Sequence, residues 1–288
     1  MTVIVKKVES YGDVPNFVRY VLENLNLFEN LEVKSIRTLP EKILIKPNFL
    51  KWDSGISTTH PEVVRSVAAF LKNSGKKVFI YEGGFTKNVA DRYFEKFSLH
   101  EFGECFNMNR GEFIEVKVGG KKLKTAKISK KALELLKDSA FFVSLPKLKV
   151  HHLSLITIGV KNNMGFLKKP AINMHRKINE KLVDLLNVLN PHLVIVDGIV
   201  GGENSESNTV AVNHGVMLAG DNVVEVDAVG AYLMGFDPLD IRFLKIAEDR
   251  GFGECDVSRI KVIGDDISGL RRKYSISGIR RMLGRLSI

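Results

Sequence analysis

The sequence predicts an α/β protein with an open, mainly parallel sheet and helices on both faces. Apolar runs of strand length alternate with segments of helical periodicity. The first clear strand pair, residues 42–48 and 77–82, encloses a helical segment, as in a parallel strand–helix–strand unit. Both runs are predominantly apolar, which is typical of strands buried on both faces.

The first half of the chain contains the best-marked helix and a hairpin. The helix is expected to start at Thr59, as N-cap of a capping box with Glu62, and to end before Gly75. A β-hairpin insertion is expected near residues 113–128, because both arms alternate around a Gly-Gly pair. The other elements expected here are strands at 3–5, 42–48 and 77–82 and helices at 16–25, 88–97 and 130–137, the last capped by Ser129.

The second half continues the alternation. A buried strand at 140–145 ends on Pro146, and another at 191–198 ends on Asp-Gly. The polar segment 201–209 is expected to form a binding loop or lid. The remaining predicted elements are a helix at 178–189, a strand at 216–221, helices at 223–234 and 238–250, and a strand at 259–263.

Length and composition fit one domain with a tail. The 288 residues are 44% hydrophobic and 26% charged, as in a soluble globular protein, and show no internal repeat or linker. We therefore expect a single α/β domain over residues 1–266 and a basic amphipathic tail over 267–288. The tail would pack on the domain or on a partner subunit of a homo-oligomer, with a membrane surface or nucleic acid as the alternative. Its helically spaced apolar residues are Ile276, Ile279, Met282, Leu283 and Leu286.

Several protein classes are disfavoured. No apolar run reaches the ~18 residues that span a bilayer, and the start of the chain resembles a strand more than a signal peptide, so a cytoplasmic protein is expected. Cys105 and Cys255 are too few for a cysteine-ligated iron–sulfur cluster within one chain, and they are expected to be reduced thiols. The net charge of +10 favours acidic partners, namely an anionic small molecule or, as second choice, nucleic acid.

Polar side chains follow the predicted strands where each strand ends. These side chains are Lys46 with Asn48, Glu82, Lys147 and Asp197. Because the carboxyl ends of parallel strands share one edge of the sheet, we expect them to converge there on an anionic ligand. No glycine-rich phosphate loop and no nucleophile elbow is present to define that ligand further.

The first part of this site is an anion contact. Lys46 and Asn48 would act together with the N-terminus of the helix at Thr59, because free N–H groups and the helix dipole attract anions. His60 would add a third contact. Turn chemistry at strand ends and a structural helix cap are the alternative interpretation of these residues.

The second part lies around two imidazoles. His151 is a candidate acid/base group or metal ligand, and His175 a second imidazole; with Asp197 they could hold a divalent metal ion. Lys161 could hold an anion or bind a cofactor covalently. Asn162 and Gly165, within Lys-Asn-Asn-Met-Gly, would line the same site.

Five short motifs in the expected order resemble the large family labelled domain of unknown function 362. The resemblance covers residues 42–253 and implies membership, but no activity, because the family has no settled reaction. Many members carry a ferredoxin-like cysteine cluster that this chain lacks. The matching motifs are I-K-P-N at 45–48, T-T-H-P-E-V-V at 58–64, P-K-L-K-x-H at 146–151 with K-N-x-x-G at 161–165, and V-D-G at 196–198.

A remoter resemblance is to the nickel-pincer lactate racemases. His151, Lys161 and His175 follow the order of a histidine, a cofactor-bearing lysine and a second histidine in those enzymes. The resemblance implies a nucleotide-derived cofactor on Lys161, although the glycines that those enzymes place between the first two residues are missing here.

The sequence as a whole predicts an enzyme or cofactor-binding protein of undefined reaction. Lys46, Lys147 and Lys161 would neutralise an anionic ligand, and Glu82 and Asp197 would supply the carboxylates.

Overall fold

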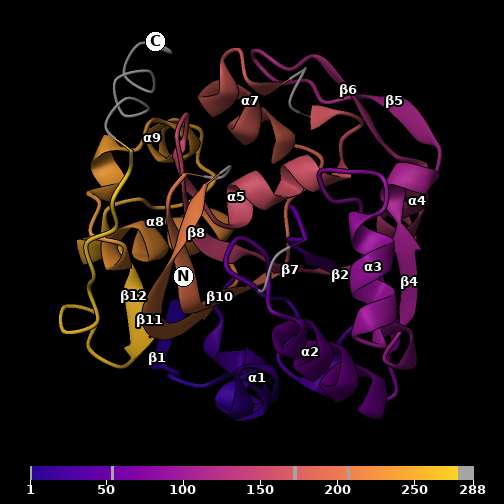
Figure 1. Ribbon diagram of the computed structural model, residues 1–288, viewed down its shortest axis with the longest axis horizontal. Helices are drawn as coiled ribbons and strands as arrows, with labels where there is room; N and C mark the ends of the chain where they lie inside the picture. Colours follow the sequence, from indigo (N-terminus) through magenta and orange to yellow (C-terminus); the bar gives the residue numbers. More distant parts are fainter. Residues whose placement is uncertain (1, 53–54, 171–173, 206–207, 278–288) are drawn as a thin grey trace.

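A computed structural model describes residues 2–52, 55–170, 174–205 and 208–277 (Figure 1). The strands are β1 (Thr2–Lys7), β2 (Lys42–Pro47), β3 (Lys77–Glu82), β4 (Glu104–Asn107), β5 (Phe113–Lys117), β6 (Thr125–Ser129), β7 (Phe141–Leu145), β8 (Lys147–His151), β9 (Leu155–Thr157), β10 (Leu193–Asn204), β11 (Thr209–Gly220) and β12 (Lys261–Gly264). The helices are α1 (Val14–Glu23), α2 (Pro61–Asn73), α3 (Val89–Lys96), α4 (Lys130–Lys137), α5 (Gly159–Asn162), α7 (Ile178–Leu185), α8 (Val223–Leu233) and α9 (Arg242–Asp249).

The main sheet is mostly parallel, as predicted. Within the described residues its ten strands follow the order β12-β1-β11-β10-β7-β2-β3-β4, with β8 paired to β10 and β9 paired to β8. The pairs from β10 through β7, β2 and β3 to β4 are all parallel, whereas β11 and β9 run antiparallel to their neighbours. The carboxyl ends of β2, β3, β7 and β10 therefore lie along one edge.

Two apolar cores flank the sheet, because side chains alternate between its faces. On β2, Ile43 and Ile45 join the core under α1, α2 and α3, while Leu44 joins the core under α4, α7, α8 and α9. Figure 1 shows α1 and α2 below the sheet and α7, α8 and α9 above it. The result is the predicted α/β architecture with helices on both faces.

The prediction of a loop at residues 201–209 is wrong for most of this segment. Residues 201–204 continue β10, which pairs with β11 as a long hairpin from Asn204 opposite Thr209. Glycines allow this close packing, since a Cβ on Gly202 would lie 3.1 Å from Cβ of Lys149. Residues 206–207 lie outside the described part.

Other elements agree with the sequence in kind and differ in their ends. The hairpin insertion is present as the antiparallel pair β5 and β6. Ser129 precedes α4 but its side chain makes no capping hydrogen bond. The predicted helix from 238 splits into a short 3-10 turn at Pro238–Asp240 and α9.

The C-terminal segment packs on the domain as far as residue 277. Tyr274 is buried and lies 3.0 Å from Nδ1 of His214, and Ile276 forms a bridge with Asn204. The predicted helical tail over 278–288 lies outside the described residues. Among the described helices, none is both long and apolar enough to cross a membrane.

Candidate functional site

The centre of the site is β8, whose residues were predicted to be the polar end of the strand that precedes it. Lys147, Lys149 and His151 alternate along it and therefore share one face. The intervening Leu148 and Val150 point into the apolar core on the other face. All five side chains are buried. The Lys-Leu-Lys-Val-His pattern thus places two ammonium groups and an imidazole in one row.

Lys147 forms a buried ion pair with Asp197. Its Nζ lies 2.8 Å from Oδ2, and neither side chain is exposed to solvent. Two further groups complete the cluster: the hydroxyl of Tyr11 donates to Oδ1 at 3.2 Å, and the backbone N–H of His60 donates to Oδ2 at 2.8 Å. Burial and the nearby carboxylate raise the pKa of Tyr11, so its hydroxyl stays protonated.

The Tyr11 ring stacks on His60, with 3.6 Å between ring centroids. Tyr11 also accepts a hydrogen bond from Nζ of Lys147 at 3.1 Å. The sequence gives no signal for Tyr11, which belongs to a short 3-10 turn (Tyr11–Asp13) far from the rest of the site in the chain.

A second buried ion pair joins Lys46 and Glu82 at the ends of β2 and β3. Glu82 also accepts hydrogen bonds from the N–H groups of Gly83 and Gly84, at 2.8 and 3.0 Å. Burial lowers the pKa of Lys46 and the adjacent Glu82 opposes that shift. Gly165 packs against this pair, because a Cβ there would lie 2.5 Å from Nζ of Lys46.

Hydrogen bonds through Asn162 and Asn48 connect Lys46 to Lys149. Asn162 donates to the carbonyl of Lys46 at 3.1 Å, and Asn48 donates to Oδ1 of Asn162 at 3.2 Å. Lys149 in turn donates to Oδ1 of Asn48 at 3.2 Å and to the carbonyl of Ser57 at 2.5 Å. Lys149 was not among the predicted site residues, although period-two alternation from Lys147 was a usable signal.

Thr59 is not the N-cap of α2, contrary to the expected capping box. Its hydroxyl instead donates to the carbonyl of Leu145 at 2.6 Å and accepts from the N–H of Asn48 at 2.9 Å. His60 is the cap, and its Nδ1 accepts a hydrogen bond from the N–H of Glu62 at 3.2 Å. Thr59 thereby ties β2, β7 and the start of α2 together.

His151 lies at the end of β8 among positively charged groups. Burial lowers its pKa well below the ordinary value, and Lys161, His152, Lys149 and His175 lower it further in that order. The ring is therefore neutral at pH 7. Lys161 is half-buried and His175 is exposed, so this part of the site lies nearest to solvent.

Hydrogen bonds also fix which nitrogen of His151 carries the proton. Nδ1 accepts from the backbone N–H groups of Leu153 and Ser154, each at 3.3 Å. An acceptor Nδ1 leaves the proton of the neutral ring on Nε2. Nε2 is therefore a hydrogen-bond donor, a role that suits an anion better than a metal ion.

Asp227 holds the segment that carries Lys161 and Asn162. Its carboxyl oxygens accept from the N–H groups of Gly159 and Val160, at 2.7 and 3.1 Å. Burial raises its pKa to about 8, and the two N–H groups oppose the shift. The buried carboxyl group of Asp227 is thus partnered by the backbone N–H groups at the start of α5.

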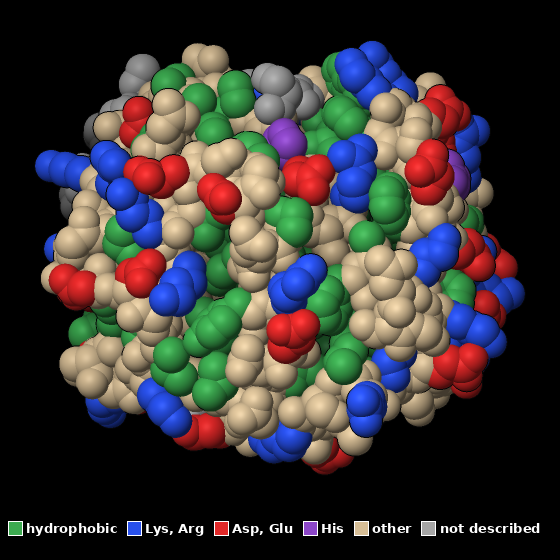
Figure 2. Space-filling model, turned by 90° about the horizontal axis from the view of Figure 1, so that it is seen from below, with side chains coloured by type: hydrophobic (Ala, Val, Ile, Leu, Met, Phe, Trp, Pro, Cys, Tyr) green, Lys and Arg blue, Asp and Glu red, His purple; other side chains and the backbone are tan. Residues whose placement is uncertain are grey.

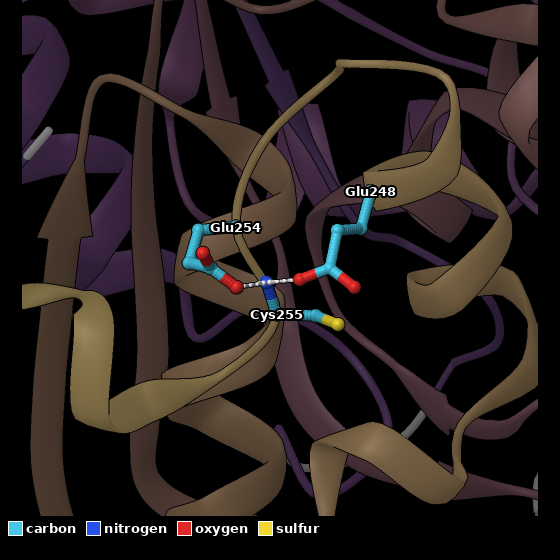
Figure 3. A group of neighbouring side chains, drawn as sticks. All are labelled: Glu248, Glu254 and Cys255. Carbon is cyan, nitrogen blue, oxygen red and sulfur yellow. Dashed lines mark hydrogen bonds between the residues drawn. The ribbon is translucent and has the colours of Figure 1, made fainter.

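Among the described residues, one further group of side chains has the composition of a metal site. Ligand atoms of Glu248, Glu254 and Cys255 lie within 4.8 Å of one another. Figure 3 shows the backbone nitrogen of Cys255 between the two carboxylates, to which it donates hydrogen bonds at 3.3 and 2.9 Å. Arg259 pairs with both glutamates. These contacts account for the cluster as a loop held by its own backbone and an arginine.

The sequence-predicted residues at the strand ends thus belong to two hydrogen-bonded groups, one around Lys147 and Asp197 and one around Lys46 and Glu82. Thr59 contacts the second group and its chain neighbour His60 contacts the first. Lys161, Lys149 and His175 act on His151 through their charge. A surface hollow of about 520 Å³ lies elsewhere, lined by Tyr232, Phe236 and Cys255 among others.

Comparisons with known proteins identify the family. The chain is 27% identical over 228 residues to the thylakoid-associated protein sll1697 of Synechocystis sp. The aligned region covers 73% of this chain and 68% of that protein. No solved structure matches the chain significantly. The resemblance to lactate racemases stays a prediction. The profile of the family described as Domain of unknown function (DUF362) matches residues 43–232, so the protein belongs to that family.

Proposed function

We propose that the protein is an enzyme or cofactor-binding protein that holds an anionic small molecule at the carboxyl edge of the sheet. The ligand's phosphate or carboxylate group would contact Lys149, His151 and Lys161. The observation that carries this proposal is the environment of His151, where four of the groups that lower its pKa are lysines and histidines. An anion would relieve the mutual repulsion of these groups.

The distribution of paired charges supports this place for the ligand. Lys46 and Lys147 are buried against Glu82 and Asp197, so within these two pairs the charges are balanced. Their role would be to shape the site. Lys149 donates to a side-chain amide oxygen and to a backbone carbonyl, and these two contacts fix the position of its ammonium group.

His151 would donate from Nε2 to the ligand, and His175 would approach from the exposed side. His60 and the N-terminus of α2 would add a polar wall next to Tyr11. A divalent metal bound by His151 and His175 is the less favoured form of this proposal, because binding through Nε2 requires the proton to move to Nδ1, which accepts two N–H bonds.

The test uses inorganic phosphate and malonate as probes of the two anion classes. NMR of histidine-labelled protein should show the pKa of His151 rising when a probe binds, because the anion stabilises the imidazolium. Lys149→Met and Lys161→Met should abolish binding measured by calorimetry. Lys77→Met, at the opposite end of β3, is the matched control and should bind normally. No binding of either probe by the wild type would refute the proposal, and native mass spectrometry of purified protein would then search for other ligands.

A nucleic-acid interface ranks second, and the net charge of +10 is what favours it. On the face seen in Figure 2, Lys and Arg side chains are interspersed with Asp and Glu. Filter binding with and without residues 268–288 tests this alternative, which requires affinity that falls steeply with salt. We propose the cytoplasm as the compartment, which suits the two free thiols.

A further inference from the structure

Thr157, at the end of β9, has a buried hydroxyl that makes no hydrogen bond. The side chain is 2% exposed, and no group of the described chain partners its Oγ1 atom. Such groups are uncommon in folded proteins, because an unsatisfied buried hydroxyl destabilises the fold. A ligand that supplies the missing partner would explain why a threonine is tolerated there.

The strand register places this hydroxyl on the same face as the cationic row. In the antiparallel β8–β9 pair, Thr157 lies directly opposite Lys149. Directly opposed residues point to the same side of a sheet, with Cβ atoms about 5 Å apart. Ile156, one residue earlier, points the other way into the apolar core with Val150. Thr157 therefore faces the side that carries Lys149 and His151.

We propose that Thr157 is a ligand-binding residue whose hydroxyl donates to an oxygen of the anion bound by Lys149 and His151. This inference rests on the proposed function and narrows it. The hydroxyl and the Nε2–H group present two donors on the face of the β8–β9 hairpin that also carries the positive charge of Lys149. A phosphate or carboxylate supplies both the negative charge and at least two acceptor oxygens for such a face.

Replacing the hydroxyl by a methyl group separates a binding role from a structural one. Thr157→Val keeps the shape of the side chain and removes an unpartnered polar atom, so the ligand-free protein should melt at a higher temperature. The same change should weaken binding of inorganic phosphate or malonate by roughly ten-fold or more, which is typical of one hydrogen bond to a charged group. Thr157→Ser keeps the hydroxyl and should retain affinity within a few fold.

Thr2 supplies the matched control. It is also fully buried, and its Oγ1 likewise lacks a partner within the described chain, but it lies at the amino end of β1, away from the carboxyl edge. Thr2→Val should therefore raise the melting temperature without changing affinity.

Calorimetry with both probes and thermal melts of the ligand-free variants decide the question. Wild-type affinity in Thr157→Val, together with lost binding in Lys149→Met, would overturn this inference and leave the proposed function intact. Failure of the wild type to bind either probe would overturn both. Should Thr157→Val not fold, Thr157→Ala gives the same comparison of affinities. The probe that binds also tells whether the site prefers phosphate or carboxylate.

Discussion

Nζ of Lys147 lies 2.8 Å from Oδ2 of Asp197, and both side chains are completely shielded from solvent. Removing one partner leaves an uncompensated buried charge, so Lys147→Met or Asp197→Asn should each lower the free energy of unfolding by ~3–5 kcal/mol. The double variant, which removes both charges, should cost clearly less than the sum. Urea unfolding of the wild type, the two single variants and the double variant measures these free energies. Lys77→Met serves as control, since its pair with Glu41 is more than half exposed and screened by solvent, so its loss should change stability little. Additive single effects would contradict the coupling.

Gly165 is required by its contact with the Lys46–Glu82 pair. An added Cβ would lie 2.5 Å from Nζ and 2.8 Å from Cε of Lys46, which is fully buried and cannot swing aside. Gly165→Ala should therefore destabilise the protein by ~1–3 kcal/mol, the usual cost of overpacking. At Gly12 an added Cβ meets nothing closer than 3.4 Å, so Gly12→Ala should stay within ~0.5 kcal/mol of wild type in the same unfolding assay. Equal effects of the two substitutions would argue against this packing.

Asp227 should make the free energy of unfolding depend on pH between about pH 4 and pH 8. Its folded pKa of about 8 exceeds the unfolded value, so the folded state holds a proton that the unfolded state has lost. Stability contributed by the protonated acid therefore falls as pH rises from ~4 to ~8, by up to ~1.4 kcal/mol per pH unit. Asp227→Asn cannot ionise, so the advantage of wild type over this variant should shrink along that range in urea unfolding. A difference for Asp227→Asn that stays constant over this range would exclude the buried acid.

His151 should have the opposite pH dependence. Its folded pKa is lowered, chiefly by burial, so the unfolded state binds the extra proton in acid. Stability should therefore decline as pH falls below the unfolded pKa of ~6.5, by up to ~1.4 kcal/mol per pH unit. His151→Gln removes this dependence, and its difference from wild type should narrow from pH 7.5 to pH 5. A difference for His151→Gln that does not change with pH would show that the ring is not held neutral.

The strand ends could be predicted because they depend on local pattern. Apolar runs ended by proline or glycine located β2, β3, β7 and the start of β10, and parallel pairing then brought Lys46, Glu82 and Asp197 to one edge. Lys149 could have been predicted in the same way, but Pro146 was interpreted as the end of the strand. In the structure Pro146 connects β7 to a second strand, β8, which carries Lys149.

Other features depend on tertiary contacts that no local pattern reveals. Thr59 has the expected capping sequence, yet its hydroxyl donates to the carbonyl of Leu145 on a distant strand. His60 is therefore the N-cap of α2. Tyr11 joins the site because α1 packs beneath the sheet. The segment 201–204 is polar and glycine-rich like a loop, but backbone pairing with β11 makes it a strand.

The network around Asp197 also bears on how the chain folds. Asp197 accepts a hydrogen bond from the hydroxyl of Tyr11, which lies 186 positions away in the sequence. It also accepts one from the backbone N–H of His60, which lies 137 positions away. Contacts of such long range form late, after the entropy of closing large loops has been overcome. Binding of the proposed anion should therefore appear only in the last kinetic phase of refolding, so that it would report complete assembly of the sheet.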